Sequence, residues 1–293
     1  MNYIVDNNEY ILGKTKEGNP VSNFKVHEII KGIIFEIDRI CRKNKIDYAL
    51  SFGSTLGLYN YGGFIPWDDD GDIAINYFDY ERFVTALKSE LSDDYIIDTE
   101  LVNEKFNPLI PAIKVRYKHS FIKEKTDITL PSRGCKDRGI FVDVCLFMGV
   151  PSDLKEHRKL LRKSKWMMPF YVIGDAFFRL NLKGMRKSLR NYEKEIATKY
   201  KDSDHVSQTV IIPFQEYPRK IVHSLSFPKE VIYPFKEYDF FGKKIYSFNN
   251  IEEFCRLRYG ENALKKLNDN GEYVDPYPRK KKKAGHIKTI EIY

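Results

Sequence analysis

The chain has 293 residues, of which 42% are hydrophobic and 31% are charged. It is therefore long enough to bury a large core, and its composition excludes a disordered or repetitive chain. Charged residues interrupt every apolar run well before the roughly 20 residues that cross a bilayer. The N-terminus lacks the pattern of a secretion signal. The four cysteines form no Cys-x-x-Cys pair, which argues against a disulfide framework or a zinc site. We expect a globular cytoplasmic protein.

Basic residues are concentrated in one segment. The net charge of the chain is +8. The segment from Leu154 to Arg190 contains eleven lysines and arginines and two acidic residues, so its own net charge is +9. This segment surrounds an apolar run from Trp166 to Leu182, and a second basic cluster extends from Arg279 to Lys283. Such segments suit an anionic partner, which could be a nucleic acid, a phosphorylated glycan or a lipid surface, or they are solvated helix faces.

Hydrophobic periodicity predicts a mixture of helices and strands. Apolar residues at three- and four-residue steps predict an amphipathic helix over 24–43, with Asn23 as its N-cap. A strand over 48–52 follows, and then a short helix that Gly62 and Gly63 break. Further helices are expected at 80–91, within 152–201 and at 251–259, and further strands around 70–75, at 95–97, 112–117 and 140–147, and as a hairpin over 235–248.

Acidic residues alternate with apolar ones after Trp67. Asp70 and Asp72 are two residues apart on a predicted strand, so their side chains project from one face, and Asp68 precedes them on the same parity. Converging carboxylates suit a hard cation. We expect Mg²⁺, or Mn²⁺ in its place, bound together with the phosphates of a substrate.

Two further features belong with these acids. Asp143 is a single acid in the apolar run 140–147, and an unpaired buried carboxylate is costly. We therefore expect a cation, a metal or hydrogen-bond donors beside Asp143, which would complete a cluster of three or four carboxylates once the sheet assembles. Upstream, Gly53 and Ser54 follow a strand and open a helix, a pattern that presents backbone amides to a phosphate.

Other interpretations of the acidic stretch are a calcium loop and a surface turn that holds no ion. An EF-hand loop that starts at Asp68 needs Gly at its sixth position and Glu at its twelfth, where this chain has Ile73 and Asp79. Trp67 before the acids and Asp143 in an apolar strand favour a metal site over an ion-free surface turn.

One long motif is similar to that of a known family. It comprises residues 52–57, FGSTLG, and residues 63–73, GFIPWDDDGDI, and it resembles the LicD family of bacterial phosphocholine transferases and fukutin-related ribitol-phosphate transferases. Weaker similarity extends to 114–116, to 142–144 and to 257–260, and His286 lies where the family often has a histidine. Two departures are Asn60 and Tyr61 in place of Arg-His, and Gly71 in place of Ile or Val.

The resemblance implies an α/β (α+β) fold. It would have a nucleotidyltransferase-like mixed sheet flanked by helices, with a helical and small β elaboration toward the C-terminus. We expect a catalytic core over 1–150 and a basic acceptor-side region over 151–293. The residues expected to bind metal are Asp68, Asp70, Asp72 and Asp143, of which Asp70, Asp72 and Asp143 are also expected to be catalytic. Those expected to contact substrates are Gly53, Ser54, Trp67, Lys114, Arg116 and His286.

The expected reaction moves a substituted phosphate, phosphocholine first among the candidates, from a CDP-activated donor to a hydroxyl of a cell-surface glycan or lipid-linked saccharide, with release of CMP. We expect no nucleic-acid partner, and peripheral contact with the inner face of an anionic membrane is an option. Two alternatives stay open. One is a nucleotidyltransferase that attacks the α-phosphate of a nucleoside triphosphate, and the other is a non-catalytic module that binds anions through its basic surface.

Overall fold

The structure is a computed structural model, and it describes residues 9–102, 113–124, 138–176, 183–208, 226–265 and 287–293. The chain divides into two compact units. The first comprises 1–145, 237–247 and 281–293, and the second comprises 146–236 and 248–280. The division into domains over 1–150 and 151–293 stays a prediction.

A mixed sheet lies in the first unit, with the strand order β5-β6-β8-β4-β3-β12-β11. β3 pairs antiparallel with β4 and parallel with β12, so the predicted mixed α/β (α+β) class is confirmed. The strands are β3 (Tyr48–Leu50), β4 (Gly71–Asn76), β5 (Tyr95–Asp98), β6 (Ile113–Tyr117), β8 (Phe141–Val150, up to residue 145 in this unit), β11 (Lys236–Phe240) and β12 (Lys243–Ser247).

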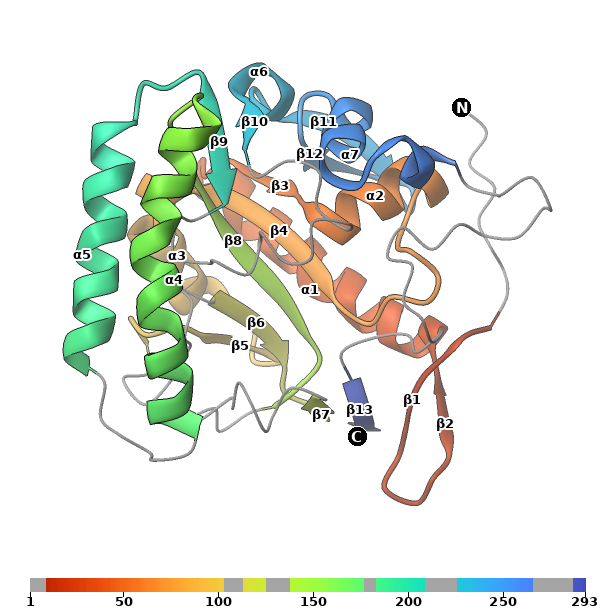
Figure 1. Ribbon diagram of the computed structural model, residues 1–293. Coiled ribbons are helices and arrows are strands. Elements are labelled where there is room, and N and C mark those ends of the chain that lie inside the picture. The colour runs from red at the N-terminus through yellow and green to blue at the C-terminus, as the bar shows by residue number, and fades with distance from the viewer. Residues whose placement is uncertain (1–8, 103–112, 125–137, 177–182, 209–225, 266–286) are drawn as a thin grey trace. The chain divides into compact units, whose positions relative to one another are not determined.

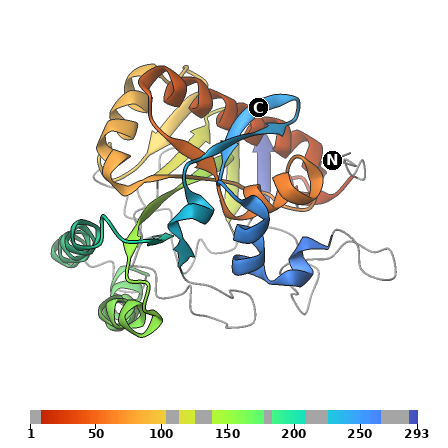
Figure 2. The same ribbon diagram turned by 90° about the horizontal axis from the view of Figure 1, so that it is seen from above.

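Helices cover this sheet, and α1 and α3 lie side by side on one of its faces (Figures 1 and 2). The helices of this unit are α1 (Asn23–Asn44), α2 (Phe52–Tyr61), the 3-10 turn η1 (Tyr77–Asp79) and α3 (Tyr80–Glu90). The predicted N-cap of α1 is wrong, because Ser22 holds that position. The Asn23 side chain instead accepts a hydrogen bond from the Tyr10 N–H at 3.0 Å, which fixes the incoming chain.

α1 approaches β4 closely at Gly71. A Cβ placed on Gly71 would lie 2.6 Å from Ile30 Cγ2 and 3.3 Å from Val142 Cγ2, so any side chain there would enter the packed core. Neighbouring strand residues point to opposite faces of a sheet. Asp72 therefore points away from α1, toward the side of the sheet where the acidic residues gather.

A second sheet of the first unit, with the order β2-β1-β13-β7, was not predicted from the sequence. β13 pairs parallel with β1 and antiparallel with β7, so it joins segments that are far apart in the chain. The strands are β1 (Ile11–Lys14), β2 (Pro20–Ser22), β7 (Ser120–Glu124) and β13 (Ile287–Ile292).

The second unit contains residues 146–150 of β8, which pair antiparallel with β9 (His205–Gln208), and β9 pairs with β10 (Phe227–Pro228). Its helices are α4 (Leu154–Ala176), α5 (Lys183–Lys199), α6 (Lys229–Ile232), α7 (Ile251–Tyr259) and the 3-10 turn η3 (Glu261–Leu264). α7 ends at Gly260, as the sequence predicts. No helix among the described residues combines the length and apolar character needed to cross a bilayer.

Candidate active site

The acidic residues lie on a turn that leads into β4. The Asp68 N–H donates to the Ile65 carbonyl oxygen at 3.0 Å, which closes a turn with Pro66 and Trp67 at its centre. Pro66 suits the second position of such a turn because its φ is fixed. β4 begins only at Gly71, so three of the acids precede the strand.

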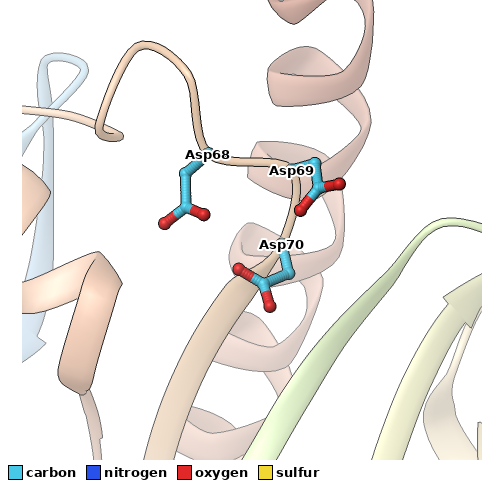
Figure 3. A group of neighbouring side chains, drawn as sticks. All are labelled: Asp68, Asp69 and Asp70. Carbon is cyan, nitrogen blue, oxygen red and sulfur yellow. The ribbon is translucent and has the colours of Figure 1, made fainter. Parts of the chain in front are cut away.

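Asp68, Asp69 and Asp70 bring their carboxylates close together. One oxygen from each lies within 4.8 Å of the others, and Figure 3 shows the three side chains following one another along the turn. Asp69 is buried, and it accepts a hydrogen bond from the Ile287 N–H of β13 at 2.7 Å. Strand alternation would place Asp69 on the opposite face from Asp68 and Asp70, but this alternation does not hold in a turn, and Asp69 was therefore not among the predicted ligands.

Asp72 is hydrogen-bonded to the residues at the beginning of α2. Its N–H donates to Ser54 Oγ at 2.9 Å, and its carbonyl oxygen accepts the Ser51 N–H at 3.0 Å. Its carboxylate accepts the Gly53 N–H. Phe52, between these donors, has a φ of 41°, a left-handed conformation that non-glycine residues adopt at functional sites when their surroundings hold them there.

This arrangement gives Gly53 and Ser54 protein partners. The Gly53 amide, which the sequence predicts to hold a phosphate, is directed at Asp72. Ser54 Oγ accepts a hydrogen bond, and a hydroxyl that accepts one bond can still donate its own proton. The expected contacts of both residues with a phosphate therefore stay predictions.

Gly53 is also the point on which two carboxylates converge. A Cβ on Gly53 would lie 3.0 Å from Asp68 Oδ2 and 3.6 Å from Asp72 Oδ2. The absence of a side chain therefore leaves room for both oxygens beside the same α-carbon. The predicted grouping of Asp68 with Asp72 agrees with this geometry.

Burial raises the pKa of Asp68 and of Asp72, and neighbouring negative charges raise each pKa further. For Asp68 these charges belong to Asp70, Asp69 and Asp72, in decreasing order. For Asp72 they belong to Asp70 and then to Asp143, while the Gly53 N–H and Lys114 offset part of the effect. Carboxylates that repel one another are stabilised by a cation between them. Asp68 and Asp70, whose oxygens lie within 4.8 Å of each other, therefore suit a divalent cation with oxygen ligands, and Asp72 stays a predicted ligand.

Asp143 has a cation beside it, as its place in an apolar strand led us to expect. Lys114 Nζ lies 2.7 Å from Asp143 Oδ1, and the two residues are direct partners across β6 and β8. The ammonium also lies 3.3 Å from the ring centroid of Phe141. Lys114 is thus held next to the acids by an ion pair and an aromatic ring.

Arg116, the other basic candidate on β6, has different partners. Its Nε donates to Asp98 Oδ2 at 2.6 Å, its Nη1 donates to the Gly139 carbonyl oxygen at 3.1 Å, and the side chain is 1% exposed. The structure thus neutralises Arg116 inside the fold. Of the two basic candidates on β6, Lys114 is the one that the structure brings to the acids.

His27 is a neighbour of the acidic turn that sequence reasoning missed. Its Nε2 lies 2.8 Å from the Asp68 carbonyl oxygen, and its ring lies 4.9 Å from that of Phe64. Burial lowers the pKa of His27, although Asp68 and Asp69 act in the opposite direction. Its position in an amphipathic helix gave no signal, because the contact depends on how α1 meets the turn.

Trp67 belongs to a group of aromatic side chains beside the acids. Its ring centroid lies 5.7 Å from that of Tyr10 and 6.1 Å from that of Tyr61, and Trp67 is half-buried. His286, predicted to contact substrate, lies outside the described residues. The residue after it, Ile287, is the one that donates to Asp69.

Comparison with known proteins leads to the same part of the chain. Residues 45–130 match the family described as LicD/FKTN/FKRP, nucleotidyltransferase domain. The lipopolysaccharide cholinephosphotransferase LicD of Haemophilus influenzae is 30% identical over 143 residues, which are 44% of this chain and 49% of that protein. The similarity therefore spans about half the length of that relative. The matched segment 45–130 contains the turn at Gly53 and the acids from Asp68 to Asp72, and over this segment the chain is similar to the LicD family.

Proposed function

We propose that this protein transfers phosphocholine from CDP-choline to a hydroxyl group of a cell-surface glycan or glycolipid and releases CMP. The observation that carries the proposal is the convergence of Asp68 and Asp72 on Gly53, inside the segment that matches the family. The name of the relative supports both the group transferred, phosphocholine, and the class of acceptor, a lipid-linked saccharide.

Asp68, Asp70 and Asp72 are the residues proposed to hold Mg²⁺, or Mn²⁺ in its place. Asp143, whose charge raises the pKa of Asp72, is the proposed fourth carboxylate of the set. A divalent cation bound there would neutralise a diphosphate that these carboxylates alone would repel.

In the proposed reaction the acceptor oxygen forms a bond to the phosphorus that carries choline. The bond from this phosphorus to the bridging oxygen breaks, and CMP leaves with that oxygen. Asp143 is the proposed acceptor of the hydroxyl proton, and Lys114, 2.7 Å from it, offsets negative charge near the phosphoryl group.

The aromatic group is the proposed site for the choline headgroup. A quaternary ammonium is attracted to the faces of aromatic rings, and Trp is the strongest such partner. Trp67, with the rings of Tyr10 and Tyr61 near it, immediately precedes Asp68 in the chain. The headgroup and the diphosphate of one donor would therefore contact adjacent residues.

A second candidate reaction is nucleotidyl transfer, which the description of the matched domain favours. The same carboxylates would serve it, but the acceptor would attack the α-phosphate of a nucleoside triphosphate. The nucleotide would then stay on the product and pyrophosphate would leave. Product analysis separates the two reactions.

The test is incubation of the protein and Mg²⁺ with lipopolysaccharide and, separately, CDP-choline, CDP-ethanolamine, CDP-glycerol or CDP-ribitol. We expect CMP release and a phosphocholine-modified acceptor with CDP-choline, and no CMP without acceptor. Asp72→Asn should abolish both signals. Asp93→Asn, which removes the same charge from an exposed position, is the matched control and should retain them. A nucleotide-modified acceptor would favour the second candidate instead.

A further inference from the structure

One exposed side of α4 carries a row of side chains with a sharp change in character. Six residues separated by steps of three or four share this side of the helix, and all six are exposed. They are Lys155, Lys159, Arg162, Trp166, Phe170 and Ile173. We call this row the split stripe, because its first three residues are basic and its last three are apolar.

The apolar half of the split stripe is strongly exposed within the described structure. Trp166 is 73% exposed, Phe170 69% and Ile173 48%, values that large apolar side chains rarely reach together on one patch. Scattered apolar residues on a surface need no explanation. Three large apolar side chains exposed on consecutive turns of one helix do need an explanation.

The other side of α4 already has its partners. His157 and Leu161 are buried there. The Tyr192 hydroxyl of α5 donates to the Leu160 carbonyl oxygen at 2.8 Å, and the Tyr200 hydroxyl donates to Glu156 Oε1 at 2.6 Å. The two helices lie side by side in Figure 1. The split stripe is therefore not the side by which α4 packs into its unit.

We propose that the split stripe docks on the surface of an anionic lipid bilayer. Trp and Phe side chains partition into the interfacial layer of a membrane, while Lys and Arg are attracted to anionic headgroups. The split stripe offers both kinds of contact in sequence along one helix. This inference does not rest on the proposed function, since it concerns a surface and no catalytic residue.

Two other occupants fit less well. A second copy of the chain would bring together two segments that each carry a balance of +9, and like charges repel. A nucleic acid would pair with Lys155, Lys159 and Arg162, but an aliphatic side chain such as Ile173 gives it nothing to bind. Both remain outcomes that the experiment can detect.

The experiment is co-sedimentation of the full chain with vesicles of phosphatidylcholine alone or of phosphatidylcholine with phosphatidylglycerol. We expect preferential binding to the anionic vesicles, weakened by added salt. Trp166→Ser with Phe170→Ser and Ile173→Ser should reduce binding at least tenfold, and so should Lys155→Glu with Lys159→Glu and Arg162→Glu. The matched charge control reverses three exposed lysines elsewhere, Lys88, Lys118 and Lys229, and should bind far more tightly than the Lys155, Lys159 and Arg162 reversal.

Fluorescence adds a readout that a general charge effect would not move. The chain has two tryptophans, Trp67 and Trp166. On binding to anionic vesicles, we expect the tryptophan emission to shift to the blue and to be quenched by spin-labelled lipid. Both effects should be lost in Trp166→Phe. The single variant Trp166→Ser, with circular dichroism as a check of folding, replaces the triple variant if that one does not fold.

Four results would overturn the proposal. The first is equal pelleting with neutral and anionic vesicles, and the second is unchanged binding in the folded apolar variant. The third is a dimer in sedimentation equilibrium that disappears in the apolar variant, which would assign the surface to self-association. Binding of single-stranded RNA tighter than that of anionic vesicles would likewise assign the surface to a nucleic acid.

Discussion

Lys114 Nζ and Asp143 Oδ1 lie 2.7 Å apart on neighbouring strands. The sequence alone predicts that removing the Asp143 charge leaves stability unchanged or raises it, because other acids lie near. The ion pair predicts that Asp143→Asn lowers the stability instead, since this change leaves the largely buried Lys114 ammonium without its partner.

Lys114→Met should therefore lower the free energy of unfolding of the metal-free protein by about 1–2 kcal/mol, a value reduced for partial exposure. The Asp72 pKa should rise further, because Lys114 lowers it. The double variant Lys114→Met with Asp143→Asn should lose less than the sum of the single losses. Denaturant unfolding measures the free energies of unfolding of the two single variants and the double variant. Strictly additive losses of stability would refute the coupling between Lys114 and Asp143.

Asp70→Asn and Asp72→Asn should each lower turnover by about a hundredfold or more, since the loss of a metal ligand weakens neutralisation of the diphosphate. Both should leave the metal-free protein equally stable or more stable, because a repulsive charge is removed. CMP release and the melting temperature are the measurements. Asp93→Asn is the control, and wild-type turnover in Asp72→Asn would show that the site is misassigned.

His157 should make the second unit sensitive to acid. It is buried, and its Nδ1 has no hydrogen-bond partner among the described residues. Burial, and secondarily His205, lowers the pKa of His157 to about 4 from 6.5. The unfolded chain therefore binds a proton at a higher pH than the folded chain does. Stability is fully present above about pH 6.5 and falls as the pH decreases toward 4, by at most about 3 kcal/mol.

The measurement for His157 is the unfolding midpoint at neutral pH and at about pH 5. His157→Phe should lose less stability between these conditions than the wild type does. His119→Phe, which removes an exposed imidazole, serves as the comparison. An unchanged pH dependence in His157→Phe would mean that His157 does not contribute.

Gly71→Val should destabilise the protein by about 1–3 kcal/mol, the usual cost of overpacking a core. The sequence suggests that a change between Gly and Val here is mild, because the side chain points away from the acids. A side chain at position 71 does point away from the acids, but Ile30 occupies the space that it would enter. Gly71→Val combined with Ile30→Ala should lose less than the sum of the two single losses, and thermal unfolding of the four proteins tests it.

Trp67→Leu should raise KM for CDP-choline by about fivefold, the equivalent of a cation–π contact of about 1 kcal/mol. It should change KM for CDP-glycerol much less, since glycerol carries no charge. Initial rates of CMP release with the two donors give the ratio. Phe78→Leu, at a 56% exposed aromatic, is the control. Equal effects on both donors would place the headgroup elsewhere.

Local patterns in the sequence predicted local structure well. The periodicity of α1 and α7 and the hairpin of β11 and β12 are confirmed. The pairing of Asp143 with a cation is confirmed as well. Each of these depends on residues within one element or on the high cost of burying a charge.

Contacts between distant segments could not be predicted in the same way. Lys114 and Arg116 share one face of β6, and only the position of Asp98 on β5 decides that Arg116 is neutralised inside the fold. The sheet of β1, β2, β7 and β13 is held by pairings across most of the chain. Its short strands have no periodicity strong enough to reveal them.

The hydrogen bond from Ile287 to Asp69 crosses 218 positions of sequence. During synthesis, the acidic turn therefore emerges from the ribosome long before Ile287, the donor of this hydrogen bond, has been added to the chain. Until β13 arrives, the Asp69 carboxylate lacks this bond, and the turn need not hold the geometry seen in the folded protein. Chains shortened before Ile287 should accordingly keep helix α1 but lose the ordered acidic turn, so the site is complete only after residue 287 has been synthesised.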